Sequence, residues 1–290
     1  MSNSTQNIIQ KTVVWLQKNR WLNIIVAIAF SCFIIFMHDS FVNVSVKLMN
    51  AYSLAAYDKA VAIIVFVIGV AVVSISGYKI YVEKSFRRAK IFFLVASFTL
   101  LTIHFFVLTE MSIEMIHALM YFGLSFLLFP LFGRYSAAII FALLVMIIDE
   151  WYQYKILYPS YVTYYELNDI LLDVLGSGLL VTLLFVFGVK NNSSNTAYFK
   201  KSEFVLLGTI LFMIFLGLAT CFFSLYPENS CGNTIFVFNN LPNPHLFWQV
   251  HPFNKAVYHV MNPIQGIAII TFTTLFFCSV SRIQKNNTAI

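Results

Sequence analysis

The feature that most constrains this chain is a series of eight apolar runs, each long enough to cross the roughly 30 Å hydrocarbon core of a bilayer as a helix. Of the 290 residues, 60% are hydrophobic and only 10% are charged. Soluble domains carry about 25% charged residues, so this chain cannot cover its surface with polar groups. The sequence therefore predicts an all-α, polytopic transmembrane helix bundle. The runs are residues 21–38, 60–82, 90–109, 112–132, 135–154, 169–189, 203–225 and 259–281.

The segments around these runs add three expectations. No cleavage site follows the first run, which we interpret as an uncleaved span rather than a signal peptide. Residues 41–57 are less apolar but keep hydrophobic residues at helical spacing, which predicts a short helix lying in the membrane interface. The third and fourth runs are nearly continuous, so they predict a tight hairpin around Glu110.

The basic residues predict the orientation of the bundle. With a cytoplasmic N-terminus, only four of the 18 Lys and Arg residues lie in external segments: Lys47, Lys59, Lys155 and Lys255. Cytoplasmic loops of membrane proteins carry an excess of Lys and Arg, so we expect both termini in the cytoplasm. The sequence pI of about 9.1 does not indicate a nucleic-acid partner, because the basic residues are spread over short loops.

The acidic residues and histidines have the opposite bias. In the same topology, only Glu83 and Glu203 of the 12 acidic residues, and none of the six histidines, fall on the cytoplasmic side. The rule for basic residues says little about acidic ones, so this bias needs a separate explanation. We expect the outer half of the bundle to carry the functional site.

The first candidate constellation consists of Glu110, Glu114, His117 and Tyr121. Their offsets of 0, 4, 7 and 11 predict that all four lie on one helical face. Ionisable residues inside a membrane are costly and usually functional. His117 could act as a general base, a metal ligand or a carboxylate partner. The structural alternative is that Glu114 and His117 only form hydrogen bonds with neighbouring helices.

The second constellation, Asp149, Glu150 and Gln153, closes the fifth run. Asp149 and Gln153 are four residues apart and share a helical face. Several tyrosines and Trp151 surround them. Such aromatics form either an interfacial belt or a stacking surface for a sugar or lipid head group, and both interpretations stay open.

The third constellation begins the sixth run. Asp169, Asp173 and Gly176 have offsets of 0, 4 and 7 and predict one face. We expect Asn168 to cap this helix, and Asp169 is favoured there by the helix dipole. Asp173 lies one turn deeper, where capping does not explain it, and Gly176 permits close helix approach.

The remaining candidates lie near the last span and the longest loop. His251 and His259 have no recognised metal-ligand spacing, so we expect structural or interfacial roles for them. The external loop 226–258 could cap the bundle or contact a partner. Cys221 and Cys231 are ten residues apart and could pair if that face is oxidising; both alternatives stay open.

The order of the three constellations resembles the VanZ-like family of bacterial membrane proteins. The matching stretches are EMIHALMYFGLSFLL, then AAIIFALLVMIIDEWYQY, then YYELNDILLDVLGSGLL, within about residues 110–187. The family shows an acidic residue before a His and a Tyr, then Asp-Glu-x-x-Gln, then Asp-x-x-x-Asn-x-x-Gly. Asp173 stands where the family usually has Asn. The resemblance divides the chain into residues 1–109, a VanZ-like three-span core at 110–190, and residues 191–290.

The resemblance implies a multi-pass protein of the bacterial inner membrane. Founding members of the family are linked to low-level resistance to glycopeptide antibiotics such as teicoplanin. We therefore expect an outward-facing acidic, histidine and aromatic cavity that binds or modifies an envelope lipid, with membrane lipids and an envelope glycolipid or polyprenyl lipid as partners. The candidate catalytic residues are Glu114, His117, Asp149, Glu150 and Asp173. The candidate binding residues are Glu110, Tyr121, Gln153, Asp169 and Gly176.

Three alternatives remain. The chain could be a metal-dependent membrane-embedded hydrolase or transferase acting on lipids, with a metal held by His117, Asp149 and Asp173 and by His259 or His104. It could be a proton-coupled transporter, because intramembrane acids and histidines suit a proton relay. Alternatively, the clusters could only lock the outer helix ends together. The sequence identifies no cofactor and leaves both enzymatic activity and metal content open.

Overall fold

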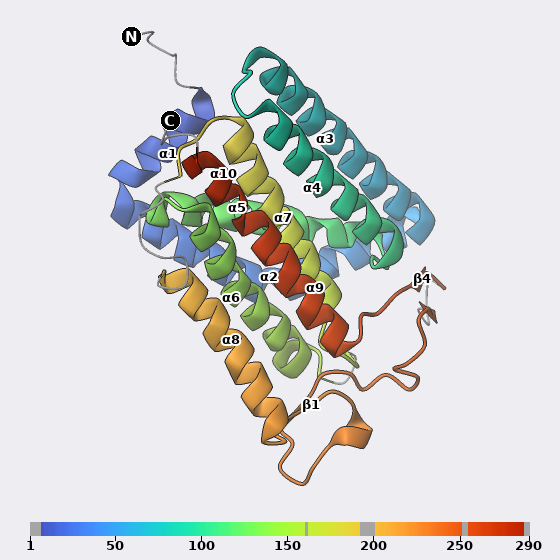
Figure 1. The fold of residues 1–290 in the computed structure, drawn as a ribbon. Coiled ribbons are helices and arrows are strands. Elements are labelled where there is room, and N and C mark those ends of the chain that lie inside the picture. The colour runs from blue at the N-terminus through green and yellow to red at the C-terminus, as the bar shows by residue number, and fades with distance from the viewer. Residues whose placement is uncertain (1–6, 160–161, 192–200, 251–254, 287–290) are drawn as a thin grey trace.

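A computed structural model describes residues 7–159, 162–191, 201–250 and 255–286 of the chain. These residues form a bundle of α-helices with two very short two-stranded sheets (Figure 1). Eight of the described helical segments are long and apolar enough to cross a membrane. The predicted all-α bundle of about eight spans is confirmed at this level, and it indicates a multi-pass membrane protein.

The helical elements in chain order are α1 (Ile8–Lys18), α2 (Arg20–Tyr52), α3 (Leu54–Val82), α4 (Arg87–Val107), η1 (Ser112–Glu114), α5 (Met115–Phe132), α6 (Tyr135–Tyr152), η2 (Gln153–Leu157), α7 (Leu167–Val186), α8 (Ser202–Ala219), η4 (Pro227–Asn229), α9 (Pro263–Cys278) and α10 (Val280–Asn286). The strands are β1 (Phe223–Ser224), β2 (Phe236–Val237), β3 (Gln249–Val250) and β4 (Val257–Tyr258). Strand β1 pairs with β2 in parallel, and β3 pairs with β4 antiparallel.

Helix α7 is the centre of the bundle. It packs against α4, α5, α6 and α9, and 89% of its apolar window is buried. Beyond Asp173 this helix is apolar on nearly all sides, and such a helix is stable only when other elements surround it. Helix α3 is the opposite case, since only 6% of its apolar window is buried. Most of the α3 surface is therefore left for lipid.

Helices α5 and α7 approach each other unusually closely at Gly176. A Cβ atom at this position would lie only 2.1 Å from the carbonyl oxygen of Ala118, so no residue other than glycine fits without movement of the helices. At the next residue of α7, Ser177, the Ser125 hydroxyl donates to the Ser177 hydroxyl at 2.8 Å. The predicted role of Gly176 in close helix approach is confirmed, and this contact fixes α7 against the start of α5.

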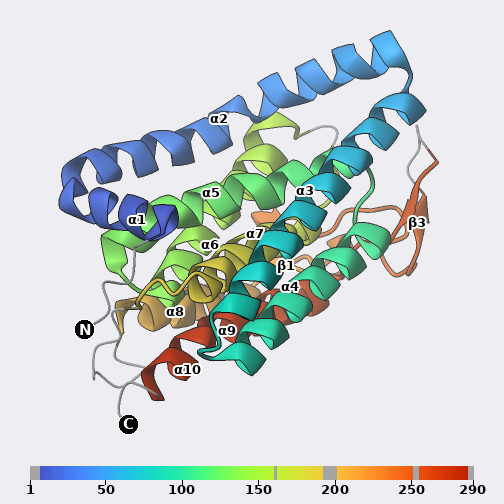
Figure 2. The same cartoon turned by 90° about the horizontal axis from the view of Figure 1, so that it is seen from above.

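Helix α2 does not follow the prediction. It runs unbroken for 33 residues, so residues 41–52 continue the first span and do not form a separate interfacial helix. No Gly or Pro interrupts this stretch, and the break comes only at Ser53, where φ is 72°. At 1.5 Å per residue α2 is about 50 Å long, much longer than the bilayer core. Its second half extends past the other helices with the start of α3 (Figure 2).

Helix α1 was not predicted from the sequence. Its signal is a capping box, in which the Asn7 side chain accepts from the Gln10 backbone N–H at 2.9 Å and the Gln10 side chain accepts from Asn7 at 3.2 Å. The side chains of Asn7 and Gln10 also donate to the Phe187 carbonyl at the end of α7. These bonds hold α1 against the bundle.

The two ends of the bundle differ in composition. Helices α1 and α10 lie at one end, which we call the termini end (Figures 1 and 2). There Arg134 forms a bidentate ion pair with the buried Glu203, with distances of 3.0 and 2.7 Å. The opposite end, the loop end, carries η1, η2 and all four strands. The tight hairpin predicted around Glu110 is confirmed there, since α4 ends at Val107 and η1 begins at Ser112.

Candidate functional site

The three constellations predicted from the sequence meet at the loop end of the bundle. The first helical turn of α5 supplies His117, the last turn of α6 supplies Asp149 and Glu150, and the first two turns of α7 supply Asp169 and Asp173. These residues come from three helices, and all are at most 6% exposed. We call these five side chains the acidic cluster.

His117 lies at the centre of the acidic cluster. Its Nε2 atom is 3.8 Å from Oδ2 of Asp169, and its Nδ1 atom is 3.4 Å from Oδ1 of Asp173. The second contact does not have the alignment of a hydrogen bond. Both carboxylates project from one face of α7 toward α5, as the sequence spacing predicted. The Gly176–Ala118 contact places that face close enough to reach His117.

Helix α6 adds two carboxylates that polar neighbours orient. The Tyr121 hydroxyl donates to Oδ2 of Asp149 at 3.0 Å, and the Gln153 amide donates to Oε1 of Glu150 at 3.2 Å. Directly after Tyr152 the backbone enters a single π-helical turn, η2, that starts at Gln153. Such turns interrupt α-helices frequently at functional sites. Tyr121 and Gln153 therefore contact two of the acids predicted to be catalytic.

Several buried atoms of the acidic cluster have no hydrogen-bond partner. They are Nδ1 of His117, Oδ1 of Asp149 and both carboxylate oxygens of Asp173. Buried polar groups in proteins are nearly always hydrogen-bonded, and leaving one unpaired costs about 1–3 kcal/mol, more for charged groups. None of the described Lys or Arg residues forms an ion pair with the four carboxylates. The cluster thus concentrates acidic groups that the surrounding protein satisfies only in part.

The prediction that Glu110 and Glu114 share a helical face with His117 was wrong. Helix α5 begins only at Met115, so Glu110 lies in the turn before η1 and does not share a helical face with His117. Glu114 turns back and accepts backbone N–H groups from Glu110 at 3.1 Å and from Met111 at 2.8 Å. The tight hairpin caused this difference, because its unpaired N–H groups need an acceptor. These contacts give Glu114 a role in capping the hairpin.

Asn168 does not cap α7, contrary to expectation. The helix begins at Leu167, which places Asn168 inside the first turn. Its side-chain amide donates to the carbonyls of Leu108 and His259 at 3.1 and 2.7 Å, and its Oδ1 accepts from Met261 N–H at 3.2 Å. Asn168 therefore joins the ends of α4 and α7 to the segment before α9. Local helix rules could not reveal these partners, which are distant in the sequence.

Glu166 lies just before α7, next to the acidic cluster. Burial, the nearby carboxylates of Asp169 and Glu114, and a hydrogen bond with Asp169 raise the pKa of Glu166 well above its ordinary value. The side chain is therefore protonated over a wider pH range than a free glutamate. The group of crowded acidic side chains thus extends to the start of α7.

His38 is a neighbour of the cluster that our constellations did not include. Its ring lies on α2 with centroids 5.8 Å from His117 and 6.1 Å from Tyr158. The Tyr158 hydroxyl donates to Asp39 at 3.1 Å, and burial together with this carboxylate raises the pKa of Tyr158 to about 12. The available signal was a His-Asp pair in the middle of an apolar helix, which indicates that this part of α2 faces a polar site.

Among the residues that the structure describes, no other histidine belongs to the five-residue cluster. Both ring nitrogens of His259 have partners, the Phe247 carbonyl at 2.6 Å and the Gln265 side chain at 3.2 Å, and the ring stacks on Phe247. This geometry agrees with a structural role. His104 is buried on α4, and neither of its ring nitrogens has a hydrogen-bond partner. His251 lies outside the described residues.

The chain matches no protein-family model, no curated protein and no solved structure. The chemistry of the site therefore has to be inferred from its geometry. One imidazole and four carboxylates can bind a cation, exchange protons or position a polar ligand, and their burial among three helices makes the arrangement rigid.

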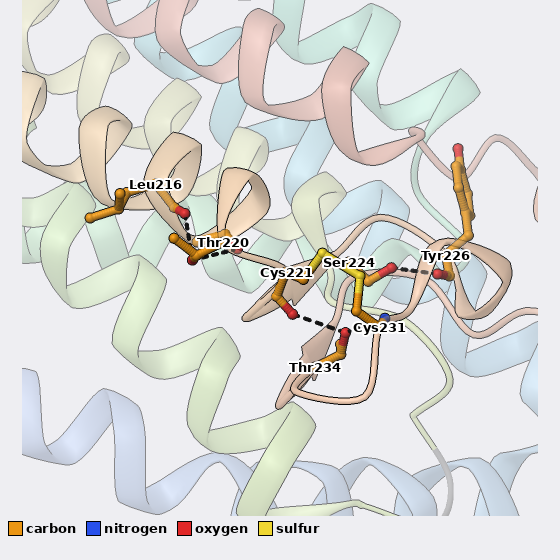
Figure 3. Close-up of a disulfide and its surroundings, with 8 residues drawn as sticks. Leu216, Thr220, Cys221, Ser224, Tyr226, Cys231 and Thr234 are labelled. Carbon is orange, nitrogen blue, oxygen red and sulfur yellow. Dashed lines mark hydrogen bonds between the residues drawn. A yellow bond between two sulfur atoms is a disulfide. The ribbon is translucent and has the colours of Figure 1, made fainter.

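The long loop after α8 covers part of the loop end. A disulfide joins Cys221 to Cys231, and the Thr234 hydroxyl donates to the Cys221 carbonyl at 3.0 Å (Figure 3). Farther along the loop, the Phe238 carbonyl accepts from Tyr165 N–H at 2.8 Å. Of the two possibilities for the cysteines, pairing is the one observed. The loop thereby forms a roof above the connection from α6 to α7.

An apolar groove lies beside the acidic cluster, on another face of α6. Its volume is about 850 Å³, and residues of α6, α8, α9 and the loop roof line it. Lys155 is the only charged residue among its described lining. Tyr165 lies between the groove and the cluster: its ring lines the groove, and burial together with the nearby Glu150 and Asp149 raises the pKa of its hydroxyl.

Proposed function

We propose that this chain is a VanZ-like integral membrane protein of the bacterial inner membrane that binds or modifies an envelope lipid or sugar-lipid at its acidic cluster. Through this lipid it alters susceptibility to glycopeptide antibiotics. The observation that carries the proposal is the convergence of three motifs that are distant in the sequence. His117, the Asp149–Glu150 pair and the Asp169–Asp173 pair form one buried constellation. A purely structural role would not require four carboxylates around one imidazole.

The proposed orientation places the loop end on the outer side of the membrane and both termini in the cytoplasm. Two independent observations support it. Positive residues are concentrated in the segments assigned to the cytoplasm. The loop end also holds the Cys221–Cys231 disulfide, and disulfides persist in oxidising compartments such as the bacterial periplasm. The acidic cluster would then face the leaflet in which envelope lipids are presented.

The groove supports a lipid as the ligand. Its lining is almost entirely aliphatic and aromatic, which suits a hydrocarbon or polyprenyl chain. Lys155 provides one positive charge in that lining for a phosphate, and its Nζ lies 4.6 Å from the ring centroid of Tyr154. Asp149 and Glu150 lie on the neighbouring face of the same helix. A lipid with its chain in the groove would carry its head group along the loop end toward the cluster.

The proposal is tested by two measurements on the full chain. Lipids bound to gently purified protein are identified by mass spectrometry, and teicoplanin susceptibility is measured in a bacterial host that expresses the chain. His117→Ala, Asp149→Asn, Glu150→Gln and Asp169→Asn are expected to abolish the susceptibility change while the protein remains folded and in the membrane. If all four variants keep the wild-type effect, the proposal is wrong.

A second pair of variants tests the groove. Lys155→Ala is expected to reduce the amount of co-purified anionic lipid, because it removes the only charge in the described lining. Lys47→Ala is the matched control, since Lys47 belongs to the same predicted side of the membrane but lies on α2, away from the groove. Equal lipid retention in both variants would exclude a phosphate contact at Lys155.

A further inference from the structure

The acidic cluster contains a set of atoms arranged as metal ligands. His117, Asp149 and Glu150 each offer one atom, a ring nitrogen or a carboxylate oxygen, and these three atoms lie within 4.8 Å of one another. All three residues are at most 4% exposed. Since His117 comes from α5 and the two acids from α6, tertiary packing and not a local motif brings them together. This explains why no short metal-binding motif is visible in the sequence.

The unpartnered atoms of the cluster provide a second, independent observation. Nδ1 of His117, Oδ1 of Asp149 and both carboxylate oxygens of Asp173 are buried without hydrogen-bond partners. A bound cation would coordinate Asp149 directly, and its positive charge would offset the negative charge of the neighbouring Asp173 carboxylate, which lies 3.4 Å from Nδ1 of His117. Without it, several acids share a low-dielectric site with a single imidazole, which is strongly unfavourable.

We propose that His117, Asp149 and Glu150 bind one divalent transition-metal ion, zinc or manganese, and that Asp173 orients His117. The donor set decides the class of metal. Imidazole nitrogen favours zinc and other transition metals, and carboxylate oxygen also suits manganese. Calcium and magnesium prefer sites made of oxygen alone.

The role of Asp173 follows from its position. Its Oδ1 lies 3.4 Å from Nδ1 of His117, and both of its oxygens are buried. Metal-bound histidines almost always place their second ring nitrogen against a carboxylate or carbonyl, which fixes the tautomer and the ring orientation. Asp173 is therefore a positioning residue. Asp169, at 3.8 Å from the other ring nitrogen, increases the negative potential that attracts a cation.

Contact between the ion and a lipid head group rests on the proposed function. If both hold, the ion is the part of the site that binds the head group. A divalent cation coordinates phosphate oxygens and can polarise a phosphoryl or carbonyl group. Tyr121 and Gln153 hold the two α6 acids from outside the ligand set, at 3.0 and 3.2 Å. The site thus combines three proposed ligands with polar neighbours that keep them in place.

The test uses full-length protein purified without chelator and without a histidine tag. Elemental analysis is expected to give about one zinc or manganese per chain for the wild type. Chelator-treated protein is then titrated with zinc, manganese, magnesium and calcium by calorimetry. We expect His117→Ala and Asp149→Asn to weaken zinc or manganese binding by at least about tenfold, and Asp173→Asn by about 10–100-fold.

His245→Ala is the matched control. His245 is an exposed histidine that pairs with Glu228 at 3.4 Å in the external loop, away from the cluster. This variant is expected to bind the ion like the wild type. If it weakens binding as much as His117→Ala does, or if chelator-treated wild type binds neither zinc nor manganese, the metal site is wrong. The wild-type titration keeps the test decisive even if a cluster variant fails to fold.

The outcomes separate the metal site from the proposed function. A co-purified envelope lipid on a wild type that binds no metal would overturn the metal site and leave the lipid proposal standing. If the wild type binds metal but the cluster variants do not affect antibiotic susceptibility, the metal site stands and the lipid proposal is wrong. Preference for calcium or magnesium over zinc and manganese would also overturn the assignment, because it would indicate an all-oxygen site.

Discussion

Replacement of Gly176 by alanine tests whether the close contact of α5 and α7 builds the site. The added Cβ would lie 2.1 Å from the Ala118 carbonyl oxygen and 2.7 Å from its Cα. Ordinary contact begins at 3.4 Å, so the helices must separate by about 1.3 Å at this point. The obstacle is backbone and cannot rotate away. Overpacking of this kind costs about 1–3 kcal/mol.

The same separation should disturb the acidic cluster. Ala118 adjoins His117, and Asp173 lies one turn before Gly176 on the same face of α7. The 3.4 Å distance between His117 and Asp173 would therefore lengthen. We expect Gly176→Ala to lower both the unfolding temperature in detergent and the retention of a bound divalent ion.

Gly208→Ala is the control for the intrinsic effect of the substitution. Gly208 lies within α8, and an added Cβ there would meet nothing within 4 Å. Alanine is favoured over glycine in a helix interior by about 1 kcal/mol, so this variant should be as stable as the wild type or more stable. Equal unfolding temperatures for the two variants would refute the tight α5–α7 contact.

Three further predictions concern the surroundings of the site. In the wild type, Glu166 should make the protein less stable as pH rises from about 4.3 toward the raised pKa of this side chain. Glu166→Gln should reduce this loss of stability, which thermal unfolding at a series of pH values measures. The sign follows because the folded state holds this proton more tightly than the unfolded chain. Arg134→Met should cost about 3–5 kcal/mol in denaturation experiments, since it leaves Glu203 buried without its ion pair. Cys221→Ser should cost about 2–4 kcal/mol, and reductant should destabilise the wild type but not this variant.

The sequence was sufficient to predict the helices whose signal is local. Apolar runs between polar segments gave the eight spans, and their bounds mostly lie within a few residues of those observed. The errors occur where the sequence contains no helix-breaking residue such as Gly or Pro to mark the end of an element. Nothing in residues 39–52 ends α2, so a change in polarity was taken for a change of element. Helix α8 ends early, at Ala219, because the chain turns at Cys221 toward its disulfide partner.

Most residues of the candidate site could be predicted from the sequence, but the contacts between them could not. Helical spacing placed Asp169, Asp173 and Gly176 on one face, and that face does meet α5. Helical spacing could not show that Glu114 turns away to cap the hairpin. It also gave no information on Asn168, whose partners lie 60, 91 and 93 residues away in the chain. Tertiary contacts of this kind leave no periodic signal in a single sequence.

The buried carboxylate of Asp173 implies that the site is maintained at a cost to stability. Neither of its oxygens has a hydrogen-bond partner, and it shares the single imidazole of His117 with three other carboxylates, so Asp173→Asn removes a poorly compensated buried charge from the chelator-treated protein. We expect this variant to be more stable than the wild type by about 1–2 kcal/mol without metal, and less stabilised when zinc or manganese is added. Thermal unfolding with and without the ion measures both effects. Glu228→Gln, on the exposed loop, should change neither. A chelated Asp173→Asn protein less stable than the wild type would show that this carboxylate is already satisfied, and would remove the reason for placing a cation beside it.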